Sequence, residues 1–136
     1  MSGVDLEEHY VNYIAALNER CFDDLTNFVA DQLIYNGAPM SVGQYRQLLE
    51  DDVRRIPDLL FDVQQLVVDR GDVACRILFD CTPVERFHGF EPSGSRVAFA
   101  EHVFYRFLDD HITRVWSLLD IGALQTQLAR TEGRIT

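Results

Sequence analysis

Hydrophobic residues recur at three- and four-residue spacing in the first part of the chain, and this spacing is typical of amphipathic helices. Over residues 5–20 the pattern is carried by Leu6, Tyr10, Tyr13, Ile14 and Leu17. It predicts one helix there and a short second one from Phe22 to Val29. A third helix is predicted from Val42 to Ile56, because Ser41 can cap its first turn and Pro57 follows its end.

Strands are predicted elsewhere, mostly after residue 59, where hydrophobic and polar residues alternate between turn signals. In chain order they are Gln32 to Asn36, Leu60 to Asp69, Val73 to Thr82, Val97 to Leu108 and His111 to Asp120. Arg70-Gly71-Asp72 and Asp109-Asp110 indicate two tight hairpin turns. Residues 83–96 form a connection, and Ile121 to Arg130 can form a last helix.

Helices followed by a meandering antiparallel sheet predict a single α+β domain over residues 1–136. If the sheet curls around the helices, it leaves a cone with one open end. Such a cone would enclose a deep, apolar pocket.

Charge and residue usage exclude several functions. A formal net charge of −10 disfavours nucleic acid and anionic membranes as partners, and it favours a neutral or apolar small molecule or no ligand. All 12 basic residues are arginine. Schiff-base aldolases, pyridoxal enzymes and P-loop nucleotidases are therefore excluded, because each needs a lysine amine.

Targeting and metal-binding signals are also missing from the sequence. Met1 to Glu8 lacks the features of a secretion signal, and no run of 18 apolar residues suggests a membrane span. The three cysteines do not indicate a disulfide framework, so we expect a cytoplasmic protein. The four histidines and the cysteines have no metal-ligand spacing, so no metal site is predicted.

The hairpin closed by Asp109-Asp110 contains the candidate chemistry. Strand alternation predicts one face that is mostly apolar but carries three charged residues. It consists of Phe99, Glu101, Val103, Tyr105, Phe107, Ile112, Arg114, Trp116, Leu118 and Asp120. His102 would point to the opposite face, and a one-residue bulge would exchange part of this assignment.

Asp120 is the predicted catalytic group, because a carboxylate among apolar neighbours is costly unless it is paired or used. A second interpretation is that Asp120 caps the last helix and that Arg114 pairs with Glu101. Further candidates for pocket groups are Tyr35 and Asn36, which can also form a turn, and His88, which can also lie in a solvated loop.

The chain resembles the SnoaL-like polyketide (ester) cyclases of the NTF2-like superfamily. The likeness is carried by three segments. They are Gly89-Phe90-Glu91-Pro92-Ser93-Gly94-Ser95-Arg96-Val97, then Phe104-Tyr105-Arg106-Phe107 with its acidic turn, and then Trp116, Asp120 and Gln127-Leu128. The resemblance implies helices packed on a curved sheet that encloses an apolar pocket, and a homodimer or higher homo-oligomer. It also implies acid/base chemistry by Asp120 in an aldol ring closure, with no cofactor.

The resulting hypothesis is a cofactor-independent cyclase or isomerase acting on an apolar carbonyl compound. Asp120 would be the acid/base group. The substrate would be bound by Trp116, Glu101, Arg114, Tyr105, Phe99, Tyr35, Asn36 and His88. Two alternatives stay open: a non-catalytic ligand-binding or dimerisation module on the same fold, and a hydrolase that opens epoxides.

Overall fold

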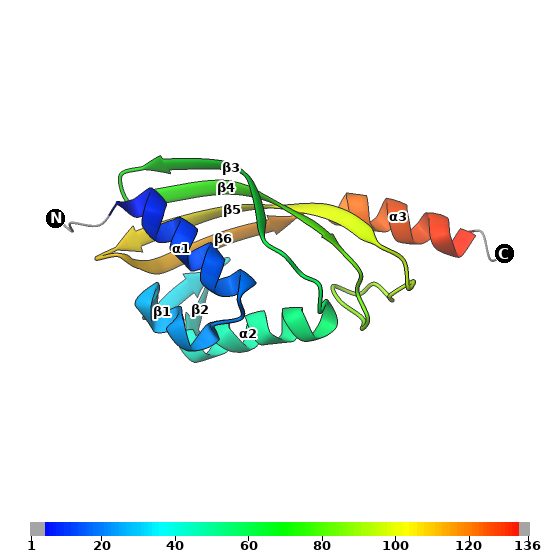
Figure 1. Cartoon of the computed structure of the whole chain (residues 1–136), viewed down its shortest axis with the longest axis horizontal. Helices are drawn as coiled ribbons and strands as arrows, with labels where there is room; N and C mark the ends of the chain where they lie inside the picture. The colour runs from blue at the N-terminus through cyan, green and yellow to red at the C-terminus, as the bar shows by residue number, and fades with distance from the viewer. Residues whose placement is uncertain (1–4, 134–136) are drawn as a thin grey trace.

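Two long helices lie along a six-stranded sheet, and a third helix extends past the ends of two strands (Figure 1). The computed structural model describes residues 5–133, with side chains described to Leu128. Residues 1–4 lie outside the described residues, and they belong to the segment that is expected to lack a secretion signal. No helix in the described part of the chain is long and apolar enough to cross a membrane.

The helices begin where side chains satisfy free backbone N–H groups. Helix α1 (Leu6–Asn18) is capped by Asp5, whose carboxylate accepts from the amides of Glu7 and Glu8. The short helix η1 (Phe22–Asn27) follows it. Helix α2 (Val42–Arg55) begins with a reciprocal capping box between Ser41 and Gln44, so the predicted cap at Ser41 is confirmed.

The sheet has the order β2-β1-β6-β5-β4-β3. Its strands are β1 (Val29–Tyr35), β2 (Ala38–Ser41), β3 (Asp62–Asp69), β4 (Asp72–Cys81), β5 (Val97–Leu108) and β6 (His111–Leu119). The predicted α+β class is confirmed, and the sheet is antiparallel as expected except at one pairing, where β1 runs parallel to β6. Helix α2 carries the chain from the β1–β2 hairpin to the far edge, and the meander then returns to β1 in the same direction.

Both predicted tight turns are confirmed. Asp69 pairs with Asp72 and Leu108 pairs with His111, so each turn has two residues. In the second turn Asp109 and Asp110 have φ of 50° and 65°. Aspartate tolerates this left-handed conformation better than most residues, and it suits the twist of a hairpin.

A β-bulge in β6 changes the direction of its side chains. Phe107 pairs with Ile112 and Arg106 pairs with Arg114, which leaves Thr113 as an extra residue. The two most buried side chains of β6 are accordingly Ile112 and Val115, three positions apart instead of two. Beyond Thr113, the residues that face the core are therefore opposite to those expected from strict alternation.

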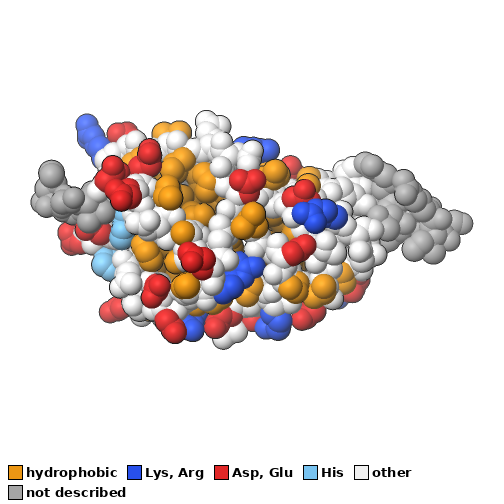
Figure 2. Space-filling view, in the orientation of Figure 1, with side chains coloured by type: hydrophobic (Ala, Val, Ile, Leu, Met, Phe, Trp, Pro, Cys, Tyr) orange, Lys and Arg blue, Asp and Glu red, His pale blue; other side chains and the backbone are white. Residues whose placement is uncertain are grey.

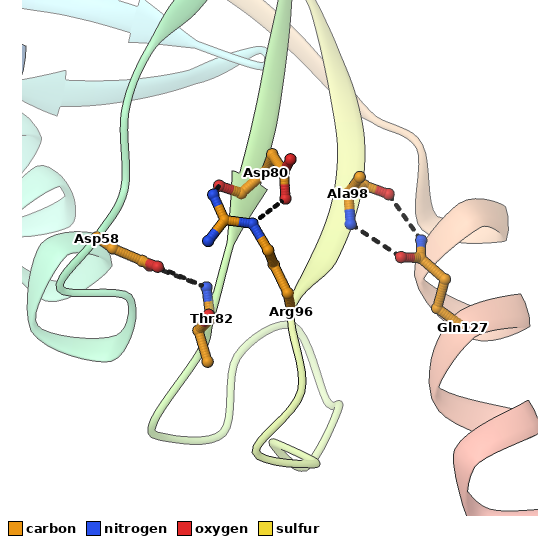
Figure 3. Close-up of polar contacts among 6 residues, drawn as sticks. All are labelled: Asp58, Asp80, Thr82, Arg96, Ala98 and Gln127. Atoms are coloured by element: carbon orange, nitrogen blue, oxygen red, sulfur yellow. Dashed lines mark hydrogen bonds and ion pairs between the residues drawn. The ribbon is translucent and has the colours of Figure 1, made fainter.

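Helix α3 (Ile121–Gly133) covers the part of β5 that extends beyond β6. The Gln127 side-chain amide donates to the carbonyl of Ala98 at 2.7 Å and accepts from its N–H at 2.8 Å (Figure 3). Leu124 and Leu128 are buried in the hydrophobic core. Thus α3 is fixed to the sheet by a backbone-like pairing and by two apolar contacts.

We expect Gly71→Ala to lower the free energy of unfolding by about 1–3 kcal/mol, because the added Cβ would lie 2.9 Å from the carbonyl oxygen of Phe107. The Phe107 oxygen belongs to the backbone and the new Cβ is attached directly to it, so neither atom can move without shifting the chain. As a control, Gly43→Ala in α2 meets only the Ser41 hydroxyl, at 3.8 Å, and should leave stability unchanged or raise it by up to about 1 kcal/mol. Urea unfolding measures both, and equal stability of Gly71→Ala and the wild type would contradict this packing.

Candidate active site

A cavity of about 740 Å³ lies between α2 and the inner face of the sheet. Its lining is mostly hydrophobic and aromatic, with a small set of polar side chains. The face shown in Figure 2 is hollowed near its centre, and charged side chains of both signs lie among the hydrophobic ones around the hollow. Space of this size and makeup is typical of sites for small organic molecules.

Two groups of aromatic rings divide the cavity wall. Phe61, Phe79, Phe87 and Phe99 form a chain of rings with centroids 5.3–6.0 Å apart. The tyrosine group consists of Tyr13, Tyr35, Tyr45 and Tyr105. The phenylalanines are wholly apolar, whereas the tyrosines provide hydroxyl groups, so the two parts of the wall favour different parts of a ligand.

Glu101 lies between these two groups. On the inner face of β5 it follows Phe99 and precedes Val103 and Tyr105 at two-residue spacing. The Ser117 hydroxyl on β6 donates a hydrogen bond to its carboxylate. Burial raises the pKa of Glu101, and the hydrogen bond from Ser117 offsets part of that rise. Glu101 is therefore a carboxyl group that holds a proton more strongly than an exposed glutamate.

Asp52 faces the same cavity from α2. Burial raises its pKa to about 7, the Glu101 charge adds to the rise, and the nearby Arg55 guanidinium opposes it. The Glu101 charge thus links the two carboxyl groups electrostatically, because an ionised Glu101 disfavours ionisation of Asp52. Acid/base catalysis at neutral pH uses groups with pKa values in this range.

The tyrosine hydroxyls form a buried network. Tyr13 and Tyr45 share a hydrogen bond of 2.6 Å, and Tyr10 contacts the Tyr105 hydroxyl at 3.3 Å and the Cys75 thiol at 2.9 Å. Burial raises the pKa of all four tyrosines. They consequently remain neutral phenols, which can donate hydrogen bonds.

The remaining wall comes from the end of α2 and from the connection 82–96. The amide of Val84 donates to the carbonyl of Arg55 at 2.8 Å, which joins the two segments. Phe87 and Phe90 exchange two backbone hydrogen bonds around a tight turn in which His88 has φ of 48°. Burial and then the Arg55 charge lower the pKa of His88. Its imidazole is thus neutral near pH 7.

Polar contacts hold the two ends of this connection together (Figure 3). At its start, the amide of Thr82 donates to both carboxylate oxygens of Asp58, at 2.9 and 3.1 Å. At its end, Arg96 donates to the Asp80 carboxylate at 2.6 Å. The turn that carries Phe87 and His88 therefore projects from a fixed base.

Six of the predicted pocket residues line the cavity: Glu101, Tyr105, Phe99, Tyr35, Asn36 and His88. Burial raises the pKa of Tyr35 to about 12. The side chain of Asn36 pairs with the backbone of Ser117 through two hydrogen bonds, at 2.8 and 3.2 Å. Asn36 therefore supports the wall by continuing the β1–β6 pairing beyond the end of β1.

Three predicted residues lie outside the cavity, because the bulge at Thr113 reverses the expected facing of β6. Trp116 is on the outer face opposite Phe104, and the Arg114 guanidinium lies 5.4 Å from the centre of its ring, not beside Glu101. The exposed Asp120 accepts from the amide of Ala123 at 3.0 Å, which is the helix-capping geometry of the second interpretation. Its catalytic role stays a prediction.

Sequence patterns did not single out Asp52, Arg55, Ser117, Tyr13 and Tyr45 as parts of the site. The signal for Asp52 was present, because it occupies the hydrophobic stripe of α2 between Leu49 and Ile56. Ser117 could not be found without knowledge of the bulge.

Outside this cavity, two earlier expectations stay predictions. Phe104 and Trp116 expose large hydrophobic areas on the outer side of the sheet, and a homodimer through this face stays a prediction. Among the residues with described side chains, no three His, Cys, Asp or Glu groups come together to hold a metal ion. Action without a cofactor stays a prediction.

Comparison with known proteins identifies relatives over almost the whole chain. Residues 7–128 match the sequence profile of the SnoaL-like polyketide cyclases. A SnoaL-like polyketide cyclase from Agrobacterium tumefaciens strain C58 is 43% identical, with a TM-score of 0.89 over 92% of this chain and 98% of that one. A search of curated proteins gave no match.

Two more distant solved structures share the fold. TsrD from Streptomyces laurentii is 18% identical, with a TM-score of 0.82 over 94% of this chain and 97% of its own. AclR from Streptomyces galilaeus is 22% identical, with a TM-score of 0.75 over 92% of this chain and 96% of its own. At these identities the likeness concerns the fold alone.

We expect Asp52 to titrate near pH 7 and to make the protein less stable as the pH rises from about 4 to 7. The folded state binds the Asp52 proton more tightly than the unfolded state does, so unfolding free energy falls over this window, by up to about 4 kcal/mol. Asp52→Asn should remove the part of this slope that Asp52 contributes, while the raised pKa of Glu101 leaves a slope of the same sign. Carboxyl NMR titration and urea unfolding at pH 4.5 and 8 measure the effect; an Asp52 pKa near 4 would contradict it.

Proposed function

Because the chain belongs to the SnoaL-like polyketide cyclase family, we propose that it is a cofactor-independent cyclase or isomerase for an apolar carbonyl compound bound in the cavity. The observation that carries the proposal is Glu101, a proton-holding carboxyl group set between hydrophobic and hydroxyl-bearing parts of the cavity wall. Such a group can remove a proton from carbon and return it to oxygen near neutral pH.

In this proposal Glu101 replaces Asp120 as the principal acid/base group. The Glu101 carboxylate faces the cavity, whereas the Asp120 carboxylate is engaged at the start of α3. The neighbouring residues Leu119 and Ile121 line the cavity, so Asp120 is close to its rim and is tested alongside Glu101.

The reaction is an intramolecular aldol closure. The ionised Glu101 carboxylate takes a proton from the carbon next to a carbonyl group, which gives an enolate and a protonated Glu101. The enolate carbon bonds to a second carbonyl carbon of the same molecule, the oxygen of that second carbonyl becomes an alkoxide, and this alkoxide takes the proton back from Glu101, which restores the carboxylate. Atoms and charge balance without an external reagent, and the fold of the bound chain determines which carbons meet.

The tyrosine hydroxyls would stabilise the enolate oxygen. In the Tyr13–Tyr45 pair only one hydroxyl proton lies between the two oxygens, so the other proton can point to a ligand. Tyr35 provides a further neutral hydroxyl at the cavity wall. Donors of this kind act most strongly where water is excluded.

We expect Glu101→Gln to slow proton exchange at the carbon between the carbonyls of apolar 1,3-diketones by about 10²- to 10⁴-fold, because the amide cannot take up the proton. NMR in D₂O follows this exchange without knowledge of the natural substrate. The glutamine side chain has nearly the same size and can still contact Ser117, so the cavity should keep its shape.

Asp120→Asn serves as the matched variant, because it changes a carboxylate to an amide at the rim. Under this proposal it retains most of the exchange activity. Loss of activity in Asp120→Asn together with full activity in Glu101→Gln would move the acid/base role to Asp120. Binding of diketones without wild-type exchange would favour the non-catalytic ligand-binding module.

A further inference from the structure

Arg55 places a positive charge at one end of the cavity. Helix α2 runs along the cavity from Tyr45 through Asp52 to Arg55. At the first end, Tyr45 shares a hydrogen bond with Tyr13. At the other end, the backbone of Arg55 is hydrogen-bonded to the connection that carries Phe87 and His88. The order along this wall is therefore tyrosines, then carboxyl groups, then the guanidinium beside the phenylalanine group.

The guanidinium of Arg55 has no ion pair and donates no hydrogen bond among the described residues, although it is half-buried. Its neighbour Arg54 differs, because it pairs with Asp51 at 2.6 Å and with Glu85 at 3.7 Å. Asp51 and Asp52 both line the cavity and both interact with the Arg55 charge, but Asp51 is paired with Arg54 and the raised pKa of Asp52 leaves it largely protonated below pH 7. An Arg side chain in this state has five unused donors arranged for a planar, two-oxygen acceptor.

We infer that Arg55 recognises a carboxylate, so that the ligand of this cavity is an apolar, conjugated or aromatic acid rather than its neutral ester or amide. The carboxylate would lie at the Arg55 end, and the apolar body would extend along Phe79 and Phe99. The reacting carbonyl would then lie in the middle of the cavity, beside Glu101. This assignment of substrate class rests on the proposed function.

The protein's net charge of −10 does not oppose such a ligand at contact range. Exposed charges are screened beyond about 8–10 Å at physiological salt, whereas a guanidinium–carboxylate contact inside a cavity is screened much less. The ligand would therefore combine the apolar body expected from the sequence with one acidic group.

The test measures binding separately from turnover. 2-Naphthoate and its neutral analogue 2-naphthamide are titrated at pH 6 by calorimetry. We expect the wild type to bind naphthoate about tenfold more tightly than naphthamide, as is typical of one charge-assisted contact. In Arg55→Gln this ratio should fall to about one, with naphthamide affinity unchanged, whereas Arg55→Lys should keep part of the preference.

Arg46→Gln is the matched control. Arg46 lies on the same helix, pairs with Asp23 at 2.7 Å and with Glu50 at 3.4 Å, and does not line the cavity, so the ratio should stay at the wild-type value. Equal wild-type affinity for the two probes, or an undiminished ratio in Arg55→Gln, would overturn the inference about Arg55. Neither of these results affects the Glu101 exchange experiment, which tests the proposed function independently.

Discussion

The extra residue at Thr113 is the constraint on which the site depends. It leaves Arg106 opposite Arg114 and thereby brings Ser117 onto the inner face, where its hydroxyl reaches Glu101. Without the bulge, the partner strand would present Arg114 and Trp116 to the cavity instead. An arginine paired with Glu101 would stabilise the ionised carboxylate and lower its pKa. A hydroxyl donor lowers the pKa less, so the pKa of Glu101 stays raised by burial.

Features determined by a few neighbouring residues could be predicted from the sequence. The caps and the two-residue turns at Arg70-Gly71 and Asp109-Asp110 depend on local backbone preferences, and the structure contains them. The α+β class and the family likeness followed from patterns spread over the whole chain, and residues 7–128 match that family. The cavity-facing side of β5, including Glu101, also followed from strict alternation.

What could not be predicted depends on pairing between distant segments. Ile112-Thr113-Arg114 contains no residue that requires a bulge, so the facing of Arg114 and Trp116 was wrong. The parallel pairing of β1 with β6 depends on the path of α2 across the domain. The place of Asp52 between Leu49 and Ile56 marks it as facing inward, but only the position of the sheet shows that this side of α2 borders a cavity.

The pairing of Gln127 with Ala98 also affects how this protein behaves toward other chains (Figure 3). Where β6 ends, β5 continues and would present an unpaired edge, the kind of surface to which a foreign strand can add. The Gln127 amide occupies both hydrogen-bonding groups of Ala98, and the amide of Asp120 donates to the carbonyl of Ala100 at 2.9 Å. The Gln127 side chain and the N-terminus of α3 thus protect this edge of β5 from pairing with strands of other molecules. The strand can therefore keep the length that places Phe99 and Glu101 in the cavity.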